Sequence, residues 1–240
     1  MTSATKQSRF KEVNEIRQKL FSLSDEKYRD FQSALVPTVE KERIIGVRTP
    51  ALRAFSKELS VGNAAQKEVF LSDLPHYYYD ENNLHAFLVE KEKDCAVLIG
   101  RLREFLPFVD NWATCDSLSP AAFKKCPKAA EEFAFDCLDS DKIYTVRFGI
   151  VTLLKLFTGE RFRSEQAEKL ATIKTDEYYV YSAIAWYFAT LLTKRYEDAL
   201  PFLLENKLDG IAHNLTIKKA TESLVVSADR KAFLKGLKIK

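Results

Sequence analysis

Two residues near the middle of the chain, Trp112 and Asp116, have the types and the spacing of a candidate chemical site. On a helix, residues four positions apart project from the same side, so a large aromatic ring and a carboxylate would lie together. Apolar neighbours on both sides indicate that this side is half-buried. An ionised carboxylate in such a place stabilises developing positive charge. The alternative is that Trp112 belongs to the core and that Asp116 caps the turn after it.

Two further residues lie in apolar surroundings where their types need an explanation. Arg147 is part of the run YTVRFGIV, and arginine is almost never buried without a partner. We expect that partner to be an anion, either Asp116 or a bound phosphate; a structural ion pair is the alternative. Trp186 follows Ala185 in a run that is apolar all round. The default interpretation is that Trp186 packs in the core. The alternative is that its ring lies at the edge of a groove.

The distribution of charge indicates where a polyanion could bind. The net charge of the 240 residues is only +3, so the surface as a whole does not attract nucleic acid strongly. From position 211 onward, however, Lys and Arg outnumber Asp and Glu by seven to two. Lys218 and Lys219 lie in this basic segment and could contact phosphate groups. A solvated basic tail is the alternative.

The composition predicts an all-α fold. The chain has 7 Gly and 7 Pro and no Asn-Gly pair, whereas a sheet protein of this length needs many tight turns. The 4 cysteines have neither CxxC spacing nor neighbouring histidines, so no metal site is predicted. Neither an apolar leader segment nor a run of membrane-spanning length occurs, and we therefore expect a cytoplasmic protein.

Hydrophobic periodicity predicts about a dozen helices with short linkers, and hence one domain over residues 1–240. The first helical stretch must stop before Pro37. Thr49 and Pro50 have the types of an N-cap and a first helical residue. The expected ranges are 8–34 (one or two helices), 49–59, 63–72, 82–92, 95–105, a short element at Trp112, 127–138, 143–157, 165–173, 178–193, 196–204, 211–224 and a last helix from 229.

A weak internal repeat favours stacked helix pairs. Residues 144–150 and 178–184 align at a spacing of 34, and each has Tyr-x-Val before a small residue, Gly149 or Ala183. A small residue there lets another helix approach closely. A hydroxyl residue followed by Asp precedes each stretch and is expected to cap its helix. Repeats of this length are typical of α-solenoids, which we favour over a bundle.

Several motifs in fixed order resemble those of the DNA alkylation repair family, the AlkD-like alkylpurine-DNA glycosylases with HEAT-like repeats. The likeness covers roughly residues 40 to 225, most of the chain. The motifs are IIGVRTPALRAFSKEL, NWATCD, SDKIYTVRFGI, EYYVYSAIAWYF and LDGIAHNLTIKKA.

The resemblance implies an α-solenoid of HEAT-like repeats whose concave, basic face wraps duplex DNA. Its partner would be double-stranded DNA that contains alkylated bases, and the protein would act as a monomer without metal or cofactor. Trp112 and Asp116 would be the catalytic aromatic and carboxylate, Arg147 would face a phosphate, and Trp186 would be a second aromatic of the cleft. The expected DNA-binding residues are Arg48, Arg53, Asn111, Lys218 and Lys219.

The implied reaction fits the chemistry of these side chains. An N3- or N7-alkylated purine is cationic and leaves easily, so a carboxylate that stabilises charge on the deoxyribose suffices. Two other functions stay open: a non-catalytic DNA-binding member of the same fold and a helical-repeat scaffold that binds peptides. The preferred adduct also stays open, as does the question whether Phe148, Tyr181 or Tyr187 fills the cleft.

Overall fold

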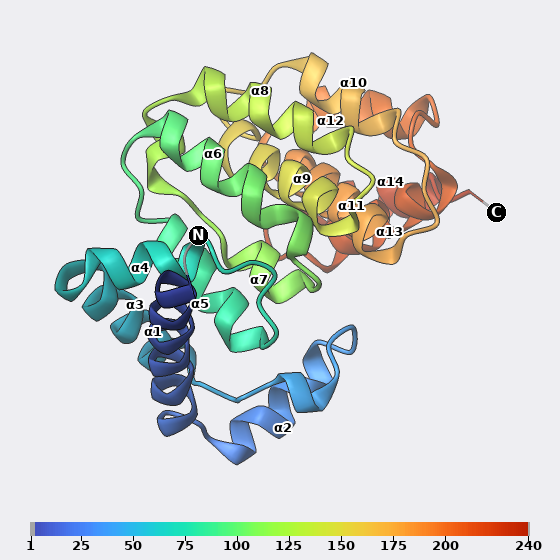
Figure 1. Ribbon diagram of the computed structural model, residues 1–240. Coiled ribbons are helices and arrows are strands. Elements are labelled where there is room, and N and C mark those ends of the chain that lie inside the picture. The colour runs from blue at the N-terminus through green and yellow to red at the C-terminus, as the bar shows by residue number, and fades with distance from the viewer. Residues whose placement is uncertain (1–2, 240) are drawn as a thin grey trace. The chain divides into compact units, whose positions relative to one another are not determined.

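The computed structural model describes residues 3–239, and within that range the chain is all-α, as its composition predicts. The only strand-like pairing there is an isolated bridge between Ser24 and Val47. Figure 1 shows the helices in order. The α-helices are α1 (Ser3–Ser22), α2 (Glu26–Leu35), α3 (Thr49–Gly62), α4 (Ala64–Leu71), α5 (Tyr79–Val89), α6 (Cys95–Phe105), α7 (Trp112–Ser117), α8 (Pro127–Leu138), α9 (Ile143–Phe157), α10 (Ser164–Ala171), α11 (Tyr178–Lys194), α12 (Tyr196–Leu204), α13 (Gly210–Glu222) and α14 (Ala228–Gly236), with short 3-10 helices η1 (Lys41–Arg43), η2 (Leu106–Phe108) and η3 (Ala121–Lys124).

Most predicted boundaries agree with these helices, and α6, α8, α9 and α12 agree at both ends. Two starts differ. Helix α5 begins three residues earlier than predicted, because the Glu81 carboxylate accepts a hydrogen bond from the backbone N–H of Tyr78 at 3.0 Å and closes the first turn. Thr49 is the first residue of α3 and not its N-cap, which is Arg48.

Packing divides the chain into two compact units, one that ends at Lys125 and one that begins at Cys126. The expectation of a single repeat domain over residues 1–240 stays a prediction. That range includes positions 1, 2 and 240, which lie outside the described residues.

In the first unit, α5 is the central helix. It packs against α1, α3, α6 and α7, and all of its residues are buried. A carboxylate within it fixes the loop before α3. Asp80 accepts hydrogen bonds from the backbone N–H groups of Ile45 (2.7 Å), Gly46 (3.2 Å) and Val47 (2.7 Å). Three N–H groups aimed at one anion form a backbone nest.

Gly46 is required in this loop for two reasons. Its φ of 90° is a conformation that favours glycine. A Cβ at this position would also lie 2.7 Å from the carbonyl oxygen of Asp25. Because the Gly46 carbonyl accepts a hydrogen bond from the Asp25 N–H at 3.0 Å, the loop also ties the start of α2 to the start of α3.

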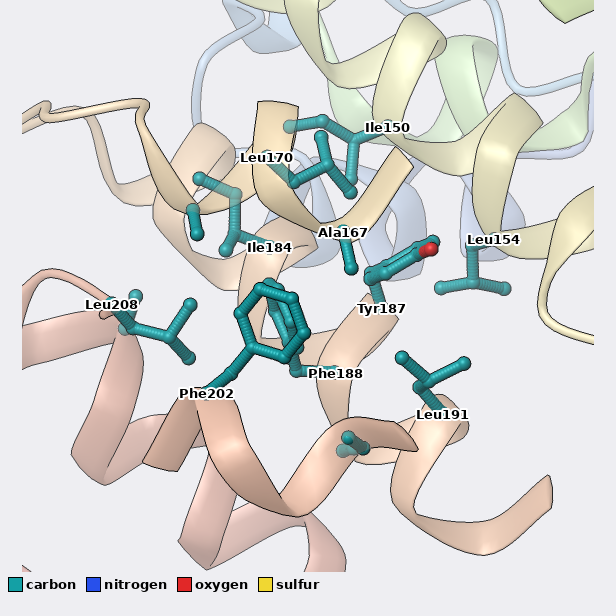
Figure 2. Packing of buried hydrophobic residues seen from close by; sticks show 14 of the residues in the cluster. Ile150, Leu154, Ala167, Leu170, Ile184, Tyr187, Phe188, Leu191, Phe202 and Leu208 are labelled. Atoms are coloured by element: carbon teal, nitrogen blue, oxygen red, sulfur yellow. The ribbon is translucent and has the colours of Figure 1, made fainter. Parts of the chain in front are cut away.

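In the second unit, α11 packs against α9 on one side and α13 on the other (Figure 1). A second helix accompanies each of these three: α8 packs on α9, α12 on α11 and α14 on α13. Figure 2 shows the core between them, in which the rings of Tyr187, Phe188 and Phe202 pack among aliphatic side chains. Pairs of helices that stack in this way form a helical-repeat arrangement.

The repeat seen in the sequence has a structural counterpart. The hydroxyl oxygen of Ser140 accepts a hydrogen bond from the N–H of Lys142 at 3.1 Å, and that of Thr175 accepts one from Glu177 at 3.0 Å. The first turn precedes α9 and the second precedes α11. The hydroxyl residues lie two positions before the N-caps, Lys142 and Glu177, so the predicted caps are turns that lead into the helices.

Gly149 allows α8 to approach α9 closely, as predicted. A Cβ there would lie 2.6 Å from the carbonyl oxygen of Ala134 and 3.0 Å from Cβ of Cys137. Because the first of these atoms is backbone, Gly149→Ala should cost about 1–3 kcal/mol of unfolding free energy. Urea denaturation followed by circular dichroism measures this change.

The control for Gly149→Ala is Gly100→Ala in α6, where an added Cβ would meet nothing within 4 Å. That change should stabilise the protein by about 0.5–1 kcal/mol through helix propensity. Equal effects of the two substitutions would contradict the close approach of α8 and α9.

Two buried histidines form a polar pair in the core of the first unit. Nε2 of His76 lies 2.9 Å from Nδ1 of His85, and the rings stack on Phe70 and Phe105. Burial, together with the charge of Arg17, lowers the pKa of His76 to about 3. Burial also lowers the pKa of His85 well below its usual value, with the charges of His76 and Arg101 adding to the effect. Both imidazoles are therefore neutral in the fold.

This pair predicts a loss of stability in acid. The pKa of His76 is about 3 in the fold and 6.5 in the unfolded chain, so its contribution is complete above pH 6.5 and is lost as the pH falls toward 3. The slope should be about 1.4 kcal/mol per pH unit for each such histidine. In urea denaturation across this window, the double variant His76→Phe/His85→Phe should have a shallower slope than the wild type. Identical slopes would show that the pair does not titrate in this way.

Candidate functional site

Helix α7 presents the first candidate residues, and a buried asparagine fixes its start. The Asn111 side chain accepts a hydrogen bond from the N–H of Thr114 at 2.8 Å. Its amide nitrogen donates to Asp110 and to the Thr114 hydroxyl, both at 3.0 Å, and that hydroxyl donates to Asn83 on α5 at 2.7 Å. Asn111 is 0% exposed. The side chain caps α7 and makes its hydrogen bonds inside the unit, and the expected contact of Asn111 with DNA stays a prediction.

Trp112, the first residue of α7, is only partly buried. Its indole Nε1 donates a hydrogen bond to the carbonyl oxygen of Leu35, the last residue of α2, at 3.0 Å. The ring also packs against a small apolar cluster that consists of Val36, Val39, Ile44 and Tyr79. Trp112 therefore joins α7 to the end of α2 and leaves part of its ring exposed.

Tyr79 completes the support beneath Trp112. Its hydroxyl accepts a hydrogen bond from Nε2 of Gln32 at 2.9 Å, which ties α5 to α2. Burial raises the pKa of Tyr79 to about 12, so the hydroxyl stays protonated at neutral pH. This residue was not among the sequence candidates, because nothing local in the sequence connects Tyr79 with Trp112.

Asp116 lies one helical turn after Trp112 and is also partly exposed. Because residues four apart project from one side of a helix, the predicted pairing of ring and carboxylate on α7 follows from its helical range.

Arg48 and Arg53, both expected DNA contacts, are exposed on the first unit and interact with acids there. Arg48 pairs with Asp25 at 2.8 Å and lies over the ring of Tyr28. Hydrogen bonding by the Tyr28 N–H, followed by that of Arg48, lowers the pKa of Asp25. Arg53 pairs with Glu90 at 2.5 Å, and its guanidinium lies 4.0 Å from the centre of a phenylalanine ring on α5. Exposed pairs of this kind contribute little to stability and can exchange for a phosphate.

In the second unit, Arg147 on α9 is buried, and its contacts include groups of α11. One guanidinium nitrogen donates to the carbonyl oxygen of Tyr179 at 2.7 Å and to the hydroxyl of Ser182 at 3.3 Å. These two acceptors are neutral, and the anionic partner expected from the sequence, Asp116 or a bound phosphate, stays a prediction. Part of the donor capacity of Arg147 is thus used inside the unit.

Trp186 is 37% exposed, although Ala185 and Tyr187 beside it are fully buried. The default interpretation of Trp186 as a core residue is therefore wrong, and its ring belongs to the surface of α11. On the adjacent α13, Lys218 is exposed and Lys219 is partly exposed.

The aromatic residues near Trp186 separate into core and surface. Phe148 and Tyr187 are buried in the core of the second unit. By contrast, Tyr178 is 58% exposed and lies edge-on to Tyr179 and Tyr181, with ring centres 5.2 and 5.4 Å apart. This tyrosine cluster at the start of α11 was missed as a candidate binding surface. The sequence feature that could have indicated this cluster is the run YYVY directly after an acidic residue.

Within residues 3–239, no group of three or more His, Cys, Asp and Glu side chains could hold a metal ion. No helix in that range has the length and apolar character needed to cross a membrane.

The fold and these side chains define an all-α protein, with stacked helix pairs in its second unit and aromatic, carboxylate and cationic groups on α3, α7, α9, α11 and α13. The model of one family, the DNA alkylation repair enzymes, matches residues 16–224. The chain therefore belongs to this family, which indicates a role in the repair of alkylated DNA. The comparison with curated proteins gave no match.

The attachment of Trp112 to α2 leads to a test of the α7 geometry. Trp112→Phe removes the indole donor that Leu35 accepts and should lower the free energy of unfolding by about 0.5–1.5 kcal/mol. Denaturation curves from circular dichroism measure this loss. The matched control is Trp186→Phe on the surface of α11, for which we expect a smaller change. A larger loss for Trp186→Phe would contradict the assignment.

Proposed function

We propose that the protein is a DNA glycosylase that hydrolyses the N-glycosidic bond of cationic N3- or N7-alkylated purines in duplex DNA. One observation carries the proposal: in a chain of the DNA alkylation repair family, Trp112 and Asp116 lie one turn apart on α7, both partly exposed. The products would be the free alkylated base and an abasic site. The protein would act as a monomer on double-stranded DNA.

The leaving base needs no strong general acid from the protein. Alkylation makes the purine cationic, and the bond from C1′ to the base nitrogen breaks with its electron pair going to the base, which becomes neutral. Positive charge then develops on the deoxyribose, and an ionised Asp116 stabilises it electrostatically. The carboxylate also orients the water whose oxygen bonds to C1′ and whose proton is released to solvent.

The aromatic and cationic residues hold the substrate in this proposal. The exposed part of the Trp112 ring offers a π face to the electron-poor sugar and base, and Trp186 offers a second one. Arg147 binds a phosphate through its guanidinium group. Phosphates farther along the duplex are bound by exposed or partly exposed side chains, namely Arg48, Arg53, Lys218 and Lys219.

A second candidate function is binding of DNA without excision. One observation favours it: Arg147 already donates to the Tyr179 carbonyl and the Ser182 hydroxyl, which reduces its capacity for a phosphate at a reacting nucleotide. Such a protein would bind DNA with a strong dependence on salt and would not need the charge of Asp116.

Asp116→Asn separates the two functions. This substitution removes the negative charge at nearly constant shape and should reduce the release of 7-methylguanine from methylated duplex by about 100- to 1,000-fold. The control is Asp73→Asn, which changes an exposed carboxylate that is 3.6 Å from Arg9 and should leave release unchanged. Chromatography of the released bases measures both. If the wild type releases no more base than spontaneous depurination does, the glycosylase proposal is wrong and the binding function is favoured.

A further inference from the structure

The first unit contains an open cavity of about 670 Å³ beside the residues that follow the C-terminal ends of α5 and α7. Its wall has three parts: Arg53 from α3, residues 90–93 from the turn after α5, and residues between Ser119 and Lys125 that follow α7. All of them belong to the unit that ends at Lys125, so the cavity is a feature of that unit alone.

Cations dominate the charged groups of this wall. They are Arg53, Lys91, Lys93 and Lys125. The wall has two acids, Glu90 and Glu92, and each already has an arginine partner. Glu90 pairs with Arg53 at 2.5 Å, and Glu92 lies 3.8 Å from Arg101. The acids are therefore partly neutralised, and the lysines give the cavity a positive potential.

The charge of Glu90 acts on Lys91, but none of the three wall lysines forms an ion pair among the described residues. Nζ of Lys91 donates to the hydroxyl of Ser56 at 2.6 Å, and burial lowers the pKa of Lys91. Across the described chain, Lys93 and Lys125 lie within ion-pair distance of no carboxylate. The charges of Arg53 and Lys57 also lower the pKa of Lys91, and a bound anion would oppose that effect.

The remaining wall suits a sugar beside an anionic group. Ala121 and Ala122 contribute small apolar surface, and Ser119 contributes a hydroxyl. Arg53 is held in place because its guanidinium lies 4.0 Å from the ring centre of Phe87. Cations around an apolar floor match the chemistry of a phosphodiester, whose charged oxygens flank a deoxyribose.

We propose that this cavity binds a phosphate and the adjoining deoxyribose of the DNA strand, through Lys91, Lys93 and Lys125. The inference rests on the proposed function only in that the protein binds DNA; excision is not required. Wall residues Ser119 to Lys125 follow α7 in the chain, and α7 carries Trp112 and Asp116.

The test uses the full chain with the double variant Lys93→Ala/Lys125→Ala. Fluorescence anisotropy with an undamaged duplex measures Kd over a series of salt concentrations. The variant should bind about 10-fold more weakly at low salt, and the slope of log K against log salt should fall by about 0.9 for each phosphate that the variant no longer neutralises. The control is Lys11→Ala/Lys19→Ala, which removes the same charge from exposed positions of α1. Equal affinity and slope for the two double variants would overturn the proposal.

A second arm distinguishes DNA from free phosphate compounds. Binding of 5′-deoxyadenosine monophosphate to the wild type and to Lys93→Ala/Lys125→Ala is measured by calorimetry. If only the wild type binds this nucleotide and both bind DNA equally, the cavity holds free nucleotides and the proposal is wrong. Release of 7-methylguanine, assayed in parallel, reports on the glycosylase separately, so either proposal can fail while the other stands.

Discussion

The hydrogen bonds of the Asp80 carboxylate are the constraint on which the rest of the first unit depends. Three backbone N–H groups of residues 45–47 converge on a side chain that is 1% exposed. Desolvation raises the pKa of Asp80, and the three donors oppose that effect. A hydrogen bond to a charged group contributes about 1.5–3 kcal/mol, so the three together can offset the cost of burying the carboxylate. The loop before α3 therefore has one conformation, which Gly46 makes possible.

Contacts with the same helix, α5, also position the candidate residues of α7. Tyr79, beside Asp80, belongs to the apolar cluster against which Trp112 packs. Asn83, one turn farther, accepts the hydrogen bond of Thr114 within α7. Contacts with α5, a helix with no exposed residue, thus position both the ring of Trp112 and the backbone that carries Asp116. This matters for catalysis, because an electrostatic effect on a reacting sugar requires a charge that is already in place.

The sequence predicts what is local and not what depends on distant partners. Helices α6, α8, α9 and α12 have strong periodicity and clear boundaries, and their ranges were predicted residue by residue. The same periodicity could not reveal that Asn111 is a buried cap, since its neighbours on α5 lie about thirty residues away. Nor could it place Trp186, because an apolar run does not say which of its residues faces out. The proposed pairing of Trp112 with Asp116 depends on their spacing and on the family resemblance together.

The polar contacts of the first unit differ in how much free energy it costs to break them. Buried hydrogen bonds fix α7, and exposed ion pairs can exchange for a phosphate. The bonds that join Asn111, Thr114 and Asn83 are buried, so breaking any of them leaves an unsatisfied group at a cost of about 1–3 kcal/mol. The ion pair of Arg48 with Asp25 involves an exposed guanidinium group and contributes about 0–1 kcal/mol. A phosphate can therefore replace Asp25 at little cost while α7 keeps its geometry. An exposed arginine can therefore exchange its carboxylate partner for a DNA phosphate without any change in the position of Asp116 on α7.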